Sequence, residues 1–104
     1  MSHYRLSKDA EGDLLEIARY IHAKAGLEPA EKVLTGIIQT IIYLGDSPNV
    51  GRHEDSYGGG TRSFVSGTYK IYYRKRRSGI LVLHVFHGAR DQTKAWQGTG
   101  RRSR

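Results

Sequence analysis

The stretch Tyr69–His87 reads YKIYYRKRRSGILVLHVFH and decides the fold. Two runs rich in β-branched and aromatic residues, 69–74 and 80–87, flank Arg76-Arg77-Ser78-Gly79, whose composition is typical of a hairpin turn. The second run is apolar on both sides of an extended chain, with Ile80, Val82 and Phe86 expected on one face and Leu81, Leu83 and Val85 on the other. This pattern predicts a central strand in a sheet that is covered on both sides.

The first run alternates two chemistries. Lys70, Tyr72 and Arg74 are expected on one face of the strand, and Tyr69, Ile71 and Tyr73 on the other. A third strand is predicted just upstream at Thr61–Val65, joined to the first run through the turn residues Ser66-Gly67. The segment 45–60, rich in Gly, Pro and Asn, is predicted to be a loop.

Two helices are predicted before this sheet. Ser7 has the character of an N-cap, and a first helix with one apolar stripe follows it and ends at Gly26. A second helix begins at Pro29 and runs to about Leu44, with a three-residue link between the two. With Tyr4–Leu6 as an edge strand, the order is β-α-α-β-β-β. The fold class is α+β, with a helical hairpin packed on a small antiparallel sheet.

The second helix has more apolar surface than one core-facing stripe requires. The surplus consists chiefly of Ile38 and Ile42. The first helix, the sheet or another chain must cover it.

The charge of the chain is unevenly distributed along its 104 residues. Residues 1–55 have six Lys or Arg against nine Asp or Glu, whereas residues 56–104 have eleven against one. We expect one domain at 1–91 and a basic C-terminal tail at 92–104. The excess of +10 in the second half suits nucleic acid or an acidic protein segment as a partner.

Several kinds of chemistry lack the residues they need. The chain has no cysteine, and its five histidines form no helical chelating pair, so neither a metal nor a cofactor is expected. The basic half has one acid, Asp91, and therefore no pair of carboxylates for hydrolysis. The Arg, Lys, Tyr and His residues that remain are suited to holding phosphates, either to bind RNA or DNA or to cleave RNA through its own 2′-OH.

The order and spacing of many residues resemble the ParE toxins of type II toxin–antitoxin systems, within the ParE/RelE superfamily. The resemblance covers about residues 3–91 and rests on Tyr4-Arg5-Leu6-Ser7, Ala10, Asp13-Leu14, Ile17-Ala18-x-Tyr20-Ile21, Ala30, Leu44, Ser47-Pro48-x-x-Gly51-Arg52, Gly60-x-Arg62, Tyr69-x-Ile71-x-Tyr73 and His87-Gly88-x-Arg90-Asp91. It implies a bacterial, cytoplasmic toxin that arrests growth by binding DNA gyrase. It also implies a cognate ParD-like antitoxin that neutralises the toxin in a hetero-oligomer, with no membrane or small-molecule ligand.

Residue assignments follow from this reading. We expect the antitoxin to contact the wide apolar helix face and the basic sheet, at Ile38, Ile42, Arg62, Lys70, Tyr72 and Arg74. We expect the target to contact cations and the tryptophan near the end of the chain, at Arg90, Trp96, Arg101 and Arg102.

A second reading is the RelE branch of the superfamily, which comprises ribosome-dependent mRNA endonucleases. In that branch Lys70 stands where a catalytic Arg is usual, and the catalytic set here would be Lys70, Arg62, His87 and Arg90. Lysine keeps the positive charge of arginine but not its bidentate fork. A third reading is a plain binding module without toxicity.

Overall fold

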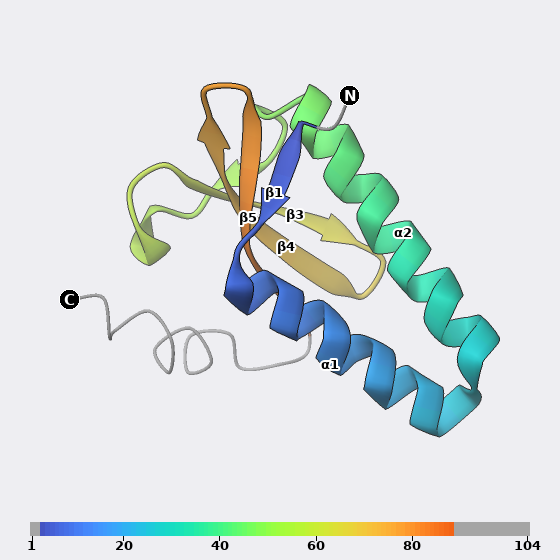
Figure 1. Ribbon diagram of the computed structural model, residues 1–104. Coiled ribbons are helices and arrows are strands. Elements are labelled where there is room, and N and C mark those ends of the chain that lie inside the picture. Colours follow the sequence, from blue (N-terminus) through green and yellow to red (C-terminus); the bar gives the residue numbers. More distant parts are fainter. Residues whose placement is uncertain (1–2, 89–104) are drawn as a thin grey trace.

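The computed structural model describes residues 3–88 as two helices packed on one face of a five-stranded sheet (Figure 1). In chain order the elements are β1 (Tyr4–Leu6), α1 (Lys8–Ala25), α2 (Leu27–Asp46), β2 (Arg52–His53), the short 3-10 helix η1 (Asp55–Tyr57), β3 (Thr61–Ser66), β4 (Tyr69–Arg76) and β5 (Gly79–His87). The predicted α+β class and the helical hairpin are confirmed. The predicted tail, 92–104, lies outside the described residues.

The strands are arranged in the order β1-β5-β4-β3-β2, so β5 is central as its composition predicts. Four strands pair antiparallel, but β1 runs parallel to β5, with Tyr4 opposite Ile80. The sheet is therefore mixed, and the prediction of an antiparallel sheet was wrong for this one pairing. A parallel neighbour needs a long crossover connection, and the two helices begin that connection directly after β1.

The helices begin and end largely where expected. The Ser7 hydroxyl accepts a hydrogen bond from the Ala10 amide at 2.9 Å and caps α1. The link between the helices is shorter than predicted, because Gly26 alone separates them, at a φ of 101° that favours glycine. Helix α2 thus begins at Leu27, and Pro29 falls within its first turn, where the missing amide hydrogen has no helical partner to lose.

A β-bulge in β5 changes which side chains share a face. Tyr72 pairs with His84 and Tyr73 with Val82, which leaves Leu83 as the extra residue. As a result Val85 joins Ile80 and Val82 on the helix side, while Phe86 lies on the opposite side of the sheet. The prediction that Phe86 shares a face with Ile80 and Val82 was wrong, because one inserted residue inverts the alternation downstream of it.

Ser7 fixes the bulge from outside the strand. Its amide donates to the Val82 carbonyl at 3.0 Å, and its hydroxyl donates to the Leu83 carbonyl at 2.9 Å. The residue that caps α1 therefore also satisfies the carbonyl of the unpaired bulge residue.

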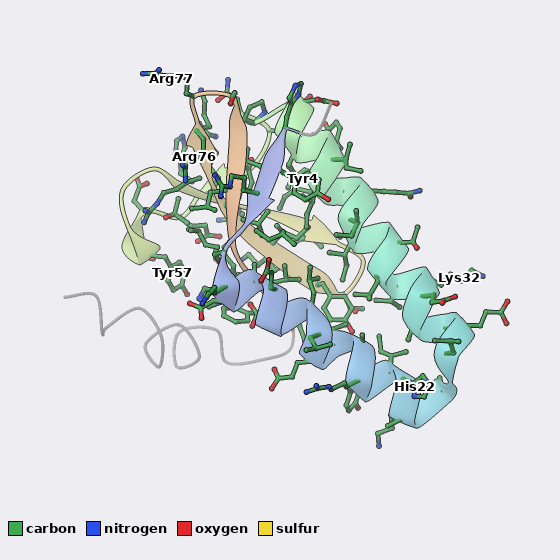
Figure 2. All side chains as sticks on the ribbon, viewed as in Figure 1. Tyr4, His22, Lys32, Tyr57, Arg76 and Arg77 are labelled. Atoms are coloured by element: carbon green, nitrogen blue, oxygen red, sulfur yellow. The ribbon has the colours of Figure 1, made fainter. Side chains whose placement is uncertain are left out.

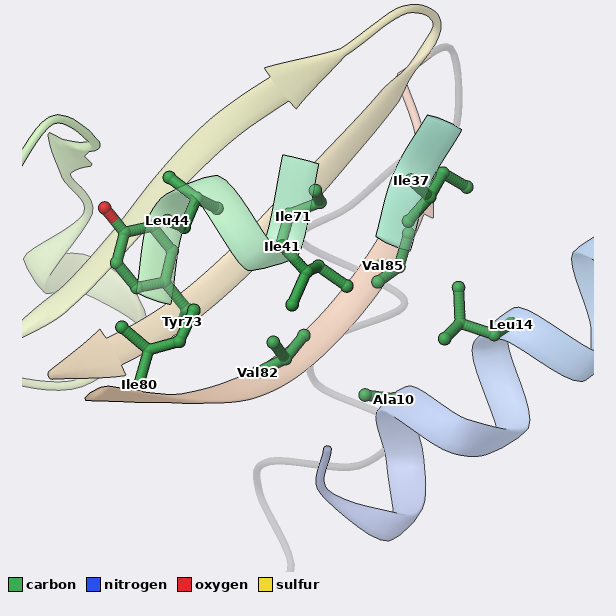
Figure 3. Packing of buried hydrophobic residues seen from close by; sticks show 10 residues of the cluster. All are labelled: Ala10, Leu14, Ile37, Ile41, Leu44, Ile71, Tyr73, Ile80, Val82 and Val85. Carbon is green, nitrogen blue, oxygen red and sulfur yellow. The ribbon is translucent and has the colours of Figure 1, made fainter. Parts of the chain in front are cut away.

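The hydrophobic core lies between the helices and the sheet (Figure 3). Helix α2 contributes more large side chains than α1, and the sheet contributes four aliphatic side chains and one tyrosine. The buried members are Ala10, Leu14, Ile37, Ile41, Leu44, Ile71, Tyr73, Ile80, Val82 and Val85. Ile38 packs against this cluster, so one half of the predicted apolar surplus on α2 is covered within the chain.

The segment between α2 and β3 is more ordered than a loop. It contains β2 and η1, and the ring of Tyr57 in η1 lies edge-on to Tyr72 at 5.2 Å between centroids. Tyr72 is on the side of the sheet away from the helices, so η1 covers part of that second face. The chain itself supplies some of the cover that the two-sided apolar strand requires.

Candidate functional site

An open groove of about 400 Å³ lies between α1 and the ends of β4 and β5. Its lining combines two carboxylates, two tyrosines, a histidine and aliphatic side chains, namely Asp13, Glu16, Ile17, Tyr20, Tyr69, Val85 and His87. Tyr20 is among the most exposed large side chains of the described residues. The groove is therefore apolar at its base and acidic along its α1 wall.

A second hollow of about 310 Å³ adjoins the first across Tyr69. It lies between α2 and the turn that joins β3 to β4, and its lining includes Lys32, Val33, Gly36 and Ile37. Because Tyr69 lines both hollows, they are neighbours, one against α1 and the other against α2.

The outer side of α2 presents exposed apolar residues. Ile42 is 48% exposed and Tyr43 is 47% exposed, and the Tyr43 ring lies 5.9 Å from the Phe64 ring on β3. Within residues 3–88 the predicted surplus at Ile42 is thus left exposed, whereas Ile38 packs against the core.

On the opposite side of the sheet, Lys70, Tyr72 and Arg74 share a face as predicted. Lys70 Nζ lies 3.2 Å from Glu54 Oε2 and 5.5 Å from the centre of the Tyr72 ring. Glu54 Oε2 also accepts a hydrogen bond from the Ser63 hydroxyl at 2.7 Å. Lys70 is therefore already engaged by an anion within its own chain.

The environment of Glu54 favours its charged form. Burial opposes ionisation, but the hydrogen bonds from Ser63 and Lys70 and the charges of Lys70 and Arg52 outweigh it, so the pKa of Glu54 is lowered. This arrangement stabilises the fold at neutral pH, and the contribution is lost as the pH falls through the lowered pKa.

Tyr72, in contrast, is held in its neutral form. It is almost completely buried, and burial, followed by the nearby Tyr57 and Glu54, raises its pKa far above the ordinary value. The phenol is neutral under physiological conditions and is not suited to act as a base.

Arg62 lies on the helix side of the sheet, opposite Tyr73. Its guanidinium donates to the carbonyls of Gly51 at 2.8 Å and Asn49 at 3.2 Å. The Tyr73 hydroxyl donates to the Pro48 carbonyl at 2.9 Å and accepts from the Gly51 amide at 2.9 Å. Arg62 and Tyr73 together hold the segment that follows α2.

The residues predicted from sequence divide between two faces. Ile38, Ile42 and Arg62 lie on the helix side, whereas Lys70, Tyr72 and Arg74 lie on the other. In the alternative nuclease set, His87 pairs with Tyr69 at one end of β4, while Arg62 pairs with Tyr73. The structure does not bring Lys70, Arg62 and His87 together. Arg90, Trp96, Arg101 and Arg102 lie outside the described residues.

Sequence reasoning missed the groove and a buried polar link beside it. Asp13 Oδ2 accepts a hydrogen bond from the Val85 amide at 2.9 Å and lies 3.0 Å from His84 Nδ1. The available signal was a carboxylate next to the apolar stripe of the first helix, one position before Leu14. An exposed Tyr20 on the same helix was a second signal.

Residues 3–88 contain no group of three or more His, Asp or Glu side chains placed to bind a metal ion. None of the helices in this part of the chain is long and apolar enough to cross a membrane.

Comparisons with known proteins agree with one another. The sequence model of one protein family, described as the ParE toxin of the type II toxin–antitoxin system parDE, matches residues 4–92. The curated protein Toxin ParE1 of Caulobacter vibrioides is 33% identical in an alignment of 92 residues that covers 86% of this chain and 96% of that protein. A solved structure of the chromosomal ParDE TA system from P. aeruginosa has the same fold, with a TM-score of 0.71 at 21% identity over 84% of this chain and 96% of that one. The chain therefore belongs to the ParE toxin family of type II toxin–antitoxin systems.

Proposed function

We propose that this protein is a toxin that inhibits DNA gyrase by binding, and that a ParD-like antitoxin neutralises it. Membership of the ParE family supports both parts of this proposal. The observation that favours binding over catalysis is the salt bridge between Lys70 and Glu54 at 3.2 Å. A lysine held in this way is poorly placed to stabilise the charge that develops on a phosphate during RNA cleavage.

The groove between the helices and Tyr69 is suited to an antitoxin segment. An amphipathic helix or extended peptide would bury its apolar side chains on Ile17, Val33 and Val85, and a basic residue would meet Asp13 or Glu16. Ile42 lines neither hollow and offers a separate exposed apolar contact on another side of α2.

The proposal keeps all six antitoxin contacts expected from the sequence, but it does not give them the same role. A segment that reaches Lys70 and Arg74 as well as Ile42 must pass around an edge of the sheet, because these residues lie on opposite faces. Tyr72 is covered by Tyr57 and contributes through their edge-to-face ring contact rather than by direct contact with the antitoxin.

Ile42→Asp is expected to weaken antitoxin binding about 10- to 100-fold, because a charge replaces an exposed apolar side chain in the interface. Isothermal titration calorimetry with the cognate antitoxin measures the change. Leu15→Asp is the matched control, since Leu15 is 52% exposed on α1 and does not line the groove. Equal affinities for wild type and Ile42→Asp would remove this side of α2 from the interface.

Lys70→Ala and His87→Ala are expected to keep the ability to arrest growth when expressed without antitoxin, with less than about a tenfold change in the inducer needed. A catalytic lysine or histidine would cost far more than this. Melting curves show whether each variant is folded. The nuclease function would replace gyrase inhibition if the wild type cleaved transcripts on translating ribosomes and both folded variants lost toxicity.

A further inference from the structure

The tip of the β4–β5 hairpin concentrates positive charge. Lys75, Arg76 and Arg77 are consecutive and exposed, and the turn residues Arg77 and Ser78 connect the final pair, Arg76 and Gly79. Figure 2 shows Arg77 projecting beyond the turn. Arg5 on β1, also exposed, pairs with Leu81 just below this tip. We call Arg5, Lys75, Arg76 and Arg77 the cationic tip.

The registers show that the end of this hairpin is a two-stranded ribbon. Pairing between β3 and β4 ends at Arg74, and pairing between β1 and β5 ends at Ile80. The last pair, Arg76 with Gly79, therefore has no paired strand on either side, and on the β1 side the backbone of His3 lies against Gly79. Lys75 pairs with Ile80, whose side chain is in the core, so Lys75 lies on the helix side and Arg76 on the opposite side. The ribbon presents cations on both faces and at its turn.

These cations are not neutralised within residues 3–88. Strands β4 and β5 contain no Asp or Glu. No salt bridge in the described part of the chain involves a residue of the cationic tip, in contrast to Lys70. Asp46, at the end of α2, lies 2.9 Å from His3 Nδ1 instead.

The shape of the tip distinguishes among anionic partners. The major groove of B-form DNA admits a two-stranded β-ribbon, and phosphates then lie on both sides of it. The major groove of A-form RNA is too deep and narrow for such a ribbon. The tip lines neither of the two hollows that share Tyr69, so it lies apart from the surface proposed for the antitoxin.

We propose that the cationic tip is a contact surface for the phosphate backbone of duplex DNA. Arg76 and Arg77 contact phosphates across the groove that the ribbon enters, and Arg5 and Lys75 contact its flanks. Arginine is suited to this role because its planar guanidinium donates two parallel hydrogen bonds to a phosphate. The inference depends on the hairpin alone and does not require that gyrase is the target.

Fluorescence anisotropy with the full-length protein and a short labelled B-form DNA duplex of mixed sequence tests the proposal. If the four cations of the tip each contact one phosphate, the logarithm of the DNA-binding constant should fall with log[salt] with a slope of about −3.6 from this surface. The double variant Arg76→Ala/Arg77→Ala is expected to bind about 10- to 30-fold more weakly at low salt, and its slope should be shallower by about two.

The matched control is Lys8→Ala/Arg19→Ala, which removes the same charge from exposed positions on α1 that line neither hollow. It is expected to retain most of the wild-type affinity, and both double variants should melt like the wild type. An equal loss of DNA affinity in the two double variants, or no binding of DNA by the wild type, would overturn the proposal. Tighter binding to an A-form RNA duplex, or more effective competition by an equally charged polyglutamate peptide, would overturn it in favour of those partners.

Discussion

Asp13→Ala is expected to lower the free energy of unfolding by about 3 kcal/mol, because it leaves a buried amide and a buried imidazole without their shared acceptor. The side chains of Asp13 and His84 are only 15% and 6% exposed. Val85 directly follows His84 and is a core residue, so α1 is attached to the central strand through this carboxylate. Urea denaturation measures the change.

The control for this prediction is Asp9→Ala on the same helix. Asp9 is 57% exposed and lies 3.8 Å from His84 Nε2, so its contribution should stay below about 1 kcal/mol. If the two substitutions differed by less than about 0.5 kcal/mol, the link through Asp13 would not hold α1 on the sheet.

Gly79→Ala is expected to destabilise the protein by about 3–4 kcal/mol, from backbone strain and steric overlap together. Gly79 has a φ of 124°, which side chains rarely tolerate, and an added Cβ would overlap the backbone carbonyl of His3. That carbonyl accepts a hydrogen bond from the Ile80 amide at 2.9 Å, at the start of the β1–β5 pairing. Thermal unfolding measures the loss, and faster hydrogen exchange at the Ile80 amide would locate it.

Gly12→Ala is the matched control for the glycine experiment. Gly12 lies within α1, and a Cβ there would meet nothing within 4 Å. Alanine should stabilise the helix at this position by about 0.5–1 kcal/mol. Wild-type stability in Gly79→Ala would show that β1 does not pack as closely against β5 as the structure has it.

Much of the fold could be predicted from local patterns. The N-cap at Ser7, the stop at Gly26, the turn at Arg76–Gly79 and the alternation along 69–74 each depend on a few neighbouring residues, and each is confirmed. The parallel direction of β1 could not be predicted in this way, because it depends on contacts between Tyr4–Leu6 and a strand more than seventy residues away.

The bulge at Leu83 shows why the side-chain faces of β5 were assigned wrongly. The run 80–87 is apolar except for His84 and His87, and His84 is itself buried, so no regular alternation of polar and apolar residues marks where the phase changes. The hydrogen bonds that accommodate the extra residue come from Ser7, far away in the sequence.

The candidate site was harder to predict than the fold. Charge and apolar excess made Lys70, Arg74 and Ile42 candidates for antitoxin contact, but the sequence could not show that Glu54 pairs with Lys70. The groove was missed because its residues come from α1, α2 and the ends of β4 and β5, and only the packing of these elements brings them together.

The most direct test of gyrase inhibition is a supercoiling assay with purified gyrase, relaxed plasmid, ATP and increasing amounts of this protein. We expect supercoiling to be lost and cleaved plasmid to accumulate, and the cognate antitoxin to reverse both effects. A folded toxin that leaves supercoiling complete even at a large molar excess over gyrase would contradict the proposed function.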